Sequence, residues 1–174
     1  MKDFKGLLAD SLDDMRGKYI CVSNAHACVM AHDDPAYWSC QAESVASIPD
    51  GKPLSVVGRK QVPTMDRVTG PDLMRETFSI SAKHGWKHYF YGDKQETLDA
   101  LRATLEREYP GMEICGMEPS VFRPLTDIEK DELCRRVDAV GTDFCWVALG
   151  APRQEVLMHD LNGRTKSLMA GVGG

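Results

Sequence analysis

Several absences narrow the classes of protein that this sequence can encode. No apolar run approaches the roughly 18 residues of a membrane span, and the polar start of the chain, residues 1–5, is unlike a signal peptide. Acidic residues outnumber basic ones by 26 to 21, which gives a net charge of −5 at pH 7. Nucleic-acid binders usually carry a basic face. We therefore expect no nucleic-acid partner, and any membrane contact to be peripheral.

Nucleotide-binding fingerprints are absent as well. The chain contains neither Gly-x-Gly-x-x-Gly nor Gly-x-x-x-x-Gly-Lys followed by Ser or Thr. These loops hold phosphate groups in dinucleotide-binding enzymes and in P-loop ATPases. Both classes are therefore disfavoured.

Cysteine and histidine spacing predicts no metal site. No two cysteines are separated by two residues, and the histidines show no ligand spacing. Buried, reduced thiols in a cytoplasmic protein explain the cysteines better than disulfides or zinc do. The six are Cys21, Cys28, Cys40, Cys115, Cys134 and Cys145. We expect neither a metal nor a cofactor.

What is present is an ordinary globular composition. The 174 residues are 43% hydrophobic and 27% charged, enough for one domain with a substantial core. In the first part of the chain we expect helices over 4–15, 25–31 and 35–46 and a strand over 19–23. The Pro-Asp-Gly stretch at 48–53 should interrupt regular structure, 54–58 reads as a short apolar segment, and 59–67 as a mobile, partly basic loop.

The later part alternates regularly between strand and helix patterns. Strands are expected over 86–91, 112–115, 144–149 and 167–172, and helices over 70–83, 95–109, 126–140 and after Pro152. Such alternation is typical of a parallel sheet flanked by helices. The sequence thus predicts an α/β fold, Rossmann-like with a mostly parallel sheet, in a single domain.

The stretch Asp143–Glu155 is the centre of this pattern. Residues 144–149 form an unbroken apolar run, as in a strand buried on both faces. Gly150 permits a sharp turn, and Pro152 suits the first turn of a helix. Gln154 and Glu155 then stand at the mouth of that helix, where open α/β sheets bind ligands. They either contact a ribose or sugar hydroxyl or belong to an ordinary strand–turn–helix connection.

Asp50 is a candidate general base. Pro-Asp-Gly is a common turn, and that is the simpler interpretation. Alternatively, Gly51 relieves the loop and the Asp50 carboxylate accepts a proton from a substrate hydroxyl. An unperturbed Asp, with a pKa of about 3.9, is a weak base, so it would need burial or a hydroxyl that becomes more acidic as it attacks.

A second candidate lies at Arg67–Asp72, before the helix over 70–83. A helix N-terminus offers free N–H groups to an anion, and Arg67 adds positive charge. The alternative is that Thr69 or Asp72 caps the helix and Arg67 is solvated.

Taken in order, these motifs resemble the WecG/TagA/CpsF glycosyltransferases. The resemblance rests on Asn24 after a strand, then Pro49–Pro53, Arg67–Leu73, Gly150–Glu155 and Gly171–Gly174. It covers about residues 18–174 as the glycosyltransferase-like domain, with residues 1–17 as an N-terminal helix.

The resemblance implies an inverting transferase that uses a UDP-sugar and an acceptor saccharide on a polyprenyl diphosphate at the cytoplasmic face of the membrane. It implies Asp50 as the general base and no divalent metal. By the resemblance, Ser23, Asn24, Gly92 and the Gly150–Glu155 turn line the substrate pocket. The full set of expected substrate-binding residues is Ser23, Asn24, Gly51, Arg67, Thr69, Gly70, Asp72, Gly92, Gly150, Pro152, Gln154 and Glu155. Ser23 departs from the Thr that often precedes the Asn, so its role carries over less directly. Arg67 and the turn at Gly70 are expected to stabilise the departing diphosphate.

The end of the chain differs from the family pattern. Relatives continue beyond Gly-Val-Gly-Gly with a helix and a membrane-associating segment, so we expect that segment to be missing here. Apolar surface left uncovered there would favour a homo-oligomer. Two alternatives stay open: a non-catalytic relative that binds sugar nucleotides, and an unrelated Rossmann-like protein.

Overall fold

The computed structural model describes residues 2–173, except the side chains of residues 2–5 and 7. Within that range six strands form one sheet in the order β2-β1-β6-β5-β3-β4, and every neighbouring pair is parallel. The strands are β1 (Tyr19–Ser23), β2 (Ala46–Pro49), β3 (Lys87–Gly92), β4 (Glu113–Glu118), β5 (Phe144–Ala148) and β6 (Leu168–Gly171). The predicted Rossmann-like α/β class is confirmed.

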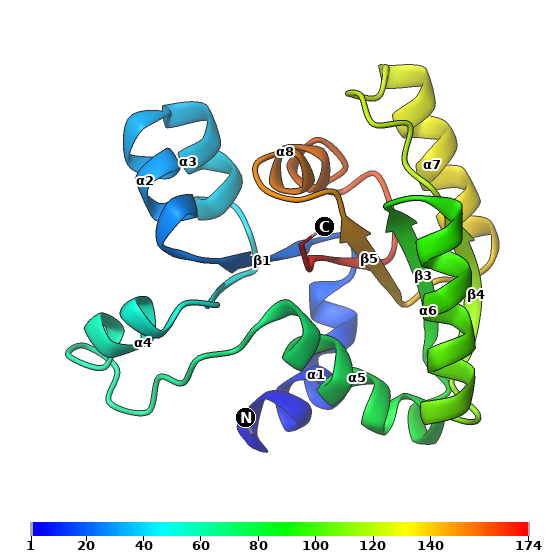
Figure 1. Ribbon diagram of the computed structural model, residues 1–174, viewed down its shortest axis with the longest axis horizontal. Helices are drawn as coiled ribbons and strands as arrows, with labels where there is room; N and C mark the ends of the chain where they lie inside the picture. The colour runs from blue at the N-terminus through cyan, green and yellow to red at the C-terminus, as the bar shows by residue number, and fades with distance from the viewer. Residues whose placement is uncertain (1, 174) are drawn as a thin grey trace.

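Helices cover both faces of the sheet (Figure 1). One face, which we call the closed face, packs against α1 (Lys2–Met15), α5 (Gly70–His84) and α6 (Gln95–Glu108). The opposite face, the open face, packs against α7 (Asp127–Ala139) and α8 (Arg153–Asp160), with α3 (Pro35–Ala42) beside α8 and α2 (Ala25–Asp33) against α3. The short helix α4 (Lys52–Gly58) lies to one side, next to β2.

Side chains of β5 show why this strand occupies the interior. Phe144 and Trp146 join the core of the closed face, and Cys145 and Val147 join the core of the open face. Alternate side chains of a strand point to opposite faces, so a continuous apolar run is what a strand covered on both sides requires. The prediction for this strand is confirmed.

The N-terminal helix belongs to the same core. Leu8, Leu12 and Met15 of α1 are buried among residues of α5 and the sheet. They repeat at helical spacing and form one apolar stripe. Residues 2–17 therefore pack as part of the single domain.

The predictions around β2 were wrong. The helix beginning at Pro35 ends at Ala42, and a strand occupies residues 46–49, where a break in regular structure was expected. This strand pairs only with β1 and is an edge strand, a place where the missing N–H of Pro49 is tolerated. Pairing with β1 thus outweighs the local signals against a strand.

The apolar segment 54–58 is likewise part of a helix, α4, with Pro53 in its first turn.

Other boundaries and burial predictions also differ. β4 continues to Glu118 because Gly116 admits the ring of Tyr89: a Cβ on Gly116 would lie 2.2 Å from the ring atom Cε2. Pro152 is the cap residue of α8 and not part of its first turn. All the cysteines are free thiols, but Cys28 is exposed and Cys115 only half-buried.

Across residues 2–173, none of the helices combines the length and apolar character needed to cross a lipid bilayer.

Candidate active site at the carboxyl edge of the sheet

The parallel strands bring most of the predicted site residues to one edge of the sheet. Ser23 ends β1, Asp50 follows β2, Gly92 ends β3, Gly150 lies just after β5, and Gly173 follows β6. In open α/β sheets this carboxyl edge is the usual ligand-binding position. The spacing of these residues along the chain gives no hint of how near one another they lie.

Asp50 is held at this edge by its main chain. Its N–H donates to the Ser23 carbonyl oxygen (2.9 Å), and its own carbonyl oxygen accepts from Arg67 Nε (2.6 Å). A second guanidinium nitrogen, Arg67 Nη2, lies 3.8 Å from Asp50 Oδ1. The carboxylate is 33% exposed, so it is fixed in place and still accessible. Gly51 has φ −93°, which any residue adopts, so the expectation that a glycine relieves this loop was wrong.

Ser23 and Asn24 have different environments. Ser23 is buried, and its hydroxyl donates to Gln41 Oε1 (2.6 Å) and lies 3.0 Å from Ser47 Oγ. Asn24 is exposed, and its Oδ1 accepts from the Ala27 N–H (3.0 Å), which caps α2 as predicted. Ser23 therefore ties β1 to α3 and β2 directly beneath Asp50.

The start of α5 is a complete capping box. The Asp72 N–H donates to Thr69 Oγ1 (3.1 Å), and the Thr69 N–H donates to Asp72 Oδ2 (3.2 Å). Hydrogen bonding of its carboxylate to the Thr69 hydroxyl, and next to the Thr69 N–H, lowers the pKa of Asp72. Because Pro71 has no N–H, this helix start has few free donors for an anion. The capping interpretation of Thr69 and Asp72 is confirmed, and Arg67 is bonded to Asp50.

Gly70 and Gly92 allow backbones to meet closely. A Cβ on Gly70 would lie 2.5 Å from the Val172 carbonyl oxygen, and one on Gly92, whose φ is +142°, would lie 2.2 Å from that of Ala148. Only glycine fits such contacts. The first contact places the start of α5 directly on the end of β6.

Gln154 and Glu155 are buried beneath the edge, with relative exposures of 2% and 1%. Gln154 Oε1 accepts from the Gly173 N–H (3.1 Å), and Gln154 Nε2 donates to Glu155 Oε1 (2.9 Å). Glu155 Oε2 has no hydrogen-bond partner. Burial raises the pKa of Glu155, and the hydrogen bond from Gln154 opposes that rise. These side chains bond within the protein and do not point into open space.

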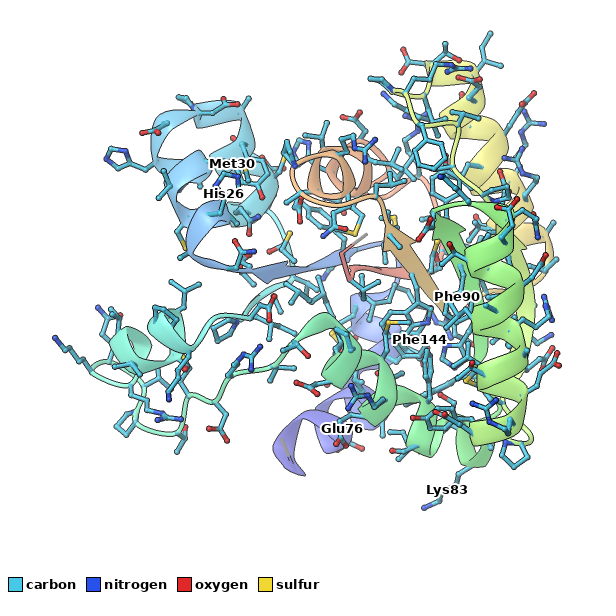
Figure 2. All side chains as sticks on the ribbon, in the orientation of Figure 1. His26, Met30, Glu76, Lys83, Phe90 and Phe144 are labelled. Atoms are coloured by element: carbon cyan, nitrogen blue, oxygen red, sulfur yellow. The ribbon has the colours of Figure 1, made fainter. Side chains whose placement is uncertain are left out.

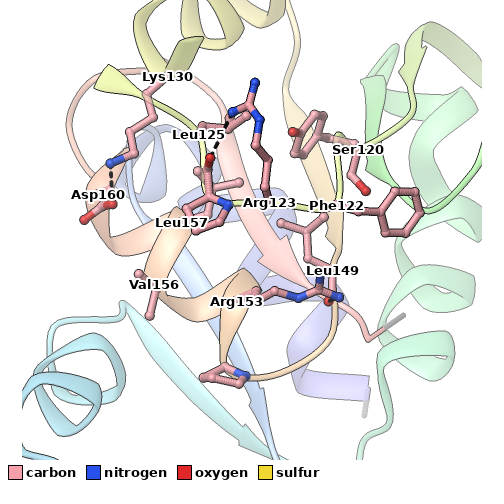
Figure 3. A pocket seen from close by; sticks show the side chains of 13 residues that line it. Ser120, Phe122, Arg123, Leu125, Lys130, Leu149, Arg153, Val156, Leu157 and Asp160 are labelled. Carbon is pink, nitrogen blue, oxygen red and sulfur yellow. Dashed lines mark hydrogen bonds and ion pairs between the residues drawn. The ribbon is translucent and has the colours of Figure 1, made fainter. Parts of the chain in front are cut away.

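Two hollows flank α8 on the open face. The first, of about 180 Å³, lies between α8 and the loop after β4 (Figure 3), and the second, a more open groove of about 760 Å³, lies between α8 and the pair α2–α3. Pro152, Val156 and Asp160 line both. Of the predicted site residues, only Pro152 lines either hollow.

The first hollow combines an apolar wall with polar groups at its rim. Its wall includes Tyr91, on the open face of β3, and Leu149, directly after β5. Phe122 lies at the rim, 55% exposed and with φ +52°, a backbone conformation that is strained for a bulky side chain. Ser120 Oγ is buried without a hydrogen-bond partner. An exposed aromatic ring beside an apolar wall suits a flat ligand.

Cations also line this hollow, each already engaged within the protein. Arg123 forms a two-pronged ion pair with Glu129, Lys130 pairs with Asp160 (2.8 Å), and Arg153 donates to the Leu149 carbonyl oxygen (2.7 Å). Figure 3 shows the Lys130–Asp160 pair at one side of the hollow and Phe122 at the other. None of the site residues predicted from the sequence lies in this loop. An aromatic–arginine pair soon after a strand, Phe122–Arg123, was the available signal.

No group of three or more His, Cys, Asp or Glu side chains could hold a metal ion among the residues that the structure describes.

The fold and the edge together define a Rossmann-like protein with a carboxylate and a ligand-sized hollow at the carboxyl ends of its strands.

The chain matches the family described as "Glycosyl transferase WecG/TagA/CpsF family" over residues 1–174. The protein belongs to this family, and is thus a glycosyltransferase of cell-surface polysaccharide synthesis. The match includes residues 1–17, ahead of the range over which the motifs show the resemblance. Gly174, the last residue of the final motif, lies outside the described residues.

Proposed function

We propose that this protein is an inverting glycosyltransferase that moves a hexose or N-acetylhexosamine-type sugar from a UDP-sugar to a saccharide on a polyprenyl diphosphate. The observation that carries the proposal is the setting of Asp50. Its main-chain N–H donates to Ser23 and its carbonyl oxygen accepts from Arg67, which fixes its position, while its carboxylate stays accessible at the edge of the sheet. A general base needs this combination of fixed position and access.

In the proposed reaction Asp50 accepts the proton of the acceptor hydroxyl. That oxygen attacks the anomeric carbon, the bond to the diphosphate breaks, and UDP leaves with inversion of configuration. The Arg67 side chain, 55% exposed, supplies positive charge beside the reacting groups. Charge placed in advance where negative charge develops lowers the barrier.

The first hollow suits the nucleotide of the donor. An aromatic ring such as Phe122, which is exposed at the rim, can stack on a base. Asp50 follows β2, and β5, three strands away, is the strand bounding the hollow that lies nearest to it in the sheet. Three strand spacings amount to about 14 Å. A base, a ribose, two phosphates and a sugar ring in series can reach across that span.

The acceptor places the reaction at the cytoplasmic face of the membrane, which the protein would contact peripherally. Such an acceptor carries its saccharide on a lipid, so the sugar to be modified lies close to the membrane surface. The carboxyl edge, with Asp50 and α4 at one end, would then face that surface.

A titration and a transfer assay test the proposal together. Calorimetry with UDP should give saturable binding, and NAD should give none. With a UDP-sugar and a polyprenyl-diphosphate saccharide, Asp50→Asn should lower kcat about 100- to 10,000-fold. Asp99→Asn makes the same change at an exposed position on α6 and should leave kcat unchanged.

Other results would point elsewhere. Full turnover by Asp50→Asn would remove the base assignment. Binding of UDP without transfer to any acceptor would favour a non-catalytic sugar-nucleotide-binding relative. Indifference to UDP would remove the donor assignment.

A further inference from the structure

We propose that Glu155 is a positioning residue, acting through Gln154 on the end of β6 and from there on the segment that holds Asp50. The inference rests on the proposed function only in naming Asp50 as the base. Glu155 is buried and lines neither hollow, so it does not reach a substrate in this structure. Its one hydrogen-bonded oxygen accepts from Gln154.

The first step is the orientation of the Gln154 amide. Its Oε1 faces the Gly173 N–H and its Nε2 faces Glu155 Oε1. Turning the amide over would set Nε2 against an N–H and Oε1 against a carboxylate, and both contacts would be repulsive. Glu155 thus selects the one orientation in which Gln154 can accept from the main chain of Gly173.

The second step is the packing of Gln154 against β6. A Cβ on Gly171 would lie 2.9 Å from Gln154 Nε2 and 2.8 Å from Met158 Cε. The amide therefore lies flat on the strand, with no room for a side chain between them. With its orientation fixed, the Gln154 side chain sets the position of the chain from Gly171 to Gly173.

The third step runs from β6 to the base. The Val172 carbonyl oxygen supports Gly70, the first residue of α5. Just before it, the Val68 N–H donates to the Pro49 carbonyl oxygen (3.0 Å), and Arg67 Nε donates to that of Asp50. A displacement of the β6 end would therefore reach Asp50 through the start of α5 and the residues before it.

The choice of a carboxylate at position 155 also needs an explanation. Leu157 and Met158 of the same helix belong to the apolar core of the open face, and Gln154 and Tyr37 are the polar side chains that favour the charged form of Glu155. One carboxylate oxygen, Oε2, has no hydrogen-bond partner, which is unfavourable in a buried site. An apolar side chain there would leave Gln154 Nε2 without its acceptor. An acceptor that orients Gln154 accounts for its presence.

Two substitutions separate this role from a merely structural one. Glu155→Leu removes the acceptor in an apolar site, and Glu155→Gln keeps an acceptor oxygen at the same length. We expect Glu155→Leu to fold with some loss of stability, because Gln154 Nε2 loses its acceptor, and to lower kcat roughly 10- to 100-fold, because small misplacements of reacting groups are costly. KM for the UDP-sugar should change less than kcat. Glu155→Gln should restore most of kcat.

A readout independent of activity accompanies the kinetics. Hydrogen exchange at the Gly173 amide should accelerate in Glu155→Leu, since the bond to Gln154 is weakened, and should return toward the wild-type rate in Glu155→Gln. This measurement does not depend on activity. If wild type transfers no sugar from a UDP-sugar, the proposed function is contradicted, but the exchange at Gly173 still tests the role of Glu155.

The outcomes that would overturn the proposal are definite. Wild-type kcat and wild-type exchange at Gly173 in Glu155→Leu would do so, and so would equal losses in the Leu and Gln variants. Should Glu155→Leu fail to fold, Gln154→Met breaks the same chain from the other side. The expected result there is again faster exchange at Gly173 and a lower kcat, and wild-type values would contradict the proposal.

Discussion

The two faces of the sheet are both buried, but they are filled differently. On the closed face, aromatic rings pack together: Phe78 meets His88, Phe90, Tyr109 and Trp146 with centroids 5.1 to 6.1 Å apart. On the open face the core is made of tyrosines, cysteines and aliphatic residues, and hollows lie on both sides of α8. Figure 2 labels Phe90 and Phe144, two of the rings in the core of the closed face.

This difference separates stability from function. Interlocked rings gain energy from burial and from edge-to-face contacts, and they leave no space for a ligand. Around the hollows of the open face the side chains are less tightly packed, and a ligand can reach the carboxyl edge of the sheet. Mutations on the closed face should therefore change stability, and mutations around the first hollow should change substrate binding.

The largest effect should come from Phe78→Ala. Phe78 is 4% exposed and touches rings on all sides, so we expect a loss of about 3–5 kcal/mol in the free energy of unfolding. KM for the UDP-sugar should be unchanged at a temperature where the variant stays folded. Denaturant unfolding and steady-state kinetics on the same sample check both. A changed KM with little loss of stability would break the comparison.

Acid should weaken the closed face next most strongly. His88 is fully buried: the Trp146 indole N–H donates to its Nδ1 (3.0 Å), and its Nε2 lies 2.8 Å from Ser81 Oγ. Burial lowers the pKa of His88 from 6.5 to about 4, and Asp143 opposes this. The unfolded chain binds a proton near pH 6.5 and the folded protein does not, so this contribution is present above that pH and is lost as pH falls.

Integrated over that interval, the expected loss is about 3 kcal/mol between pH 6.5 and 4. Unfolding free energies measured across this range check it. His88→Gln, which cannot titrate, should be less stable at pH 7 but should show a flatter dependence on pH. An equally steep curve in that variant would assign the acid sensitivity to other groups.

The smallest effect, and the one that sharpens the comparison, should come from Phe122→Ala. It makes the same change as Phe78→Ala, but at the rim of the first hollow, where the ring is 55% exposed. Loss of stacking on a base should weaken the binding free energy of the UDP-sugar by about 1–2 kcal/mol, which raises KM roughly 5- to 30-fold. The melting temperature should stay within a few degrees of wild type. A large loss of stability with unchanged KM would show that the ring serves the fold.

Much of the fold could be predicted because its signals are local. The apolar run at Phe144–Val147 predicts a strand, and the capping box at Thr126–Glu129 predicts the start of a helix. Each signal lies within a few residues, and both elements occur as predicted. Strand β2 could not be found in this way. Its sequence, Ala-Ser-Ile-Pro, is a poor strand by composition, and it becomes one because β1 offers a free edge.

The candidate site shows the same division. Residue types and motif order single out Asp50, Arg67 and the stretch after β5. They do not show that Arg67 bonds to Asp50, since the bond spans a whole helix and loop. Nor do they show that Gln154 and Glu155 are buried. A polar side chain at a helix start looks alike in sequence whether it faces solvent or the core.

The sequence by itself therefore determined the class of the protein. Apolar residues recur with strand and helix periodicity in turn, and each periodicity allows only one kind of backbone to bury those residues. The ordered motifs added the resemblance to a glycosyltransferase family. Only the tertiary structure decided which polar residues meet. Contacts between the ends of different strands depend on sheet order, and the order β2-β1-β6-β5-β3-β4 is set by packing of the whole chain. That order carries residues far apart in sequence to one edge, where Asp50 lies beside Arg67 and Gln154 holds the end of β6.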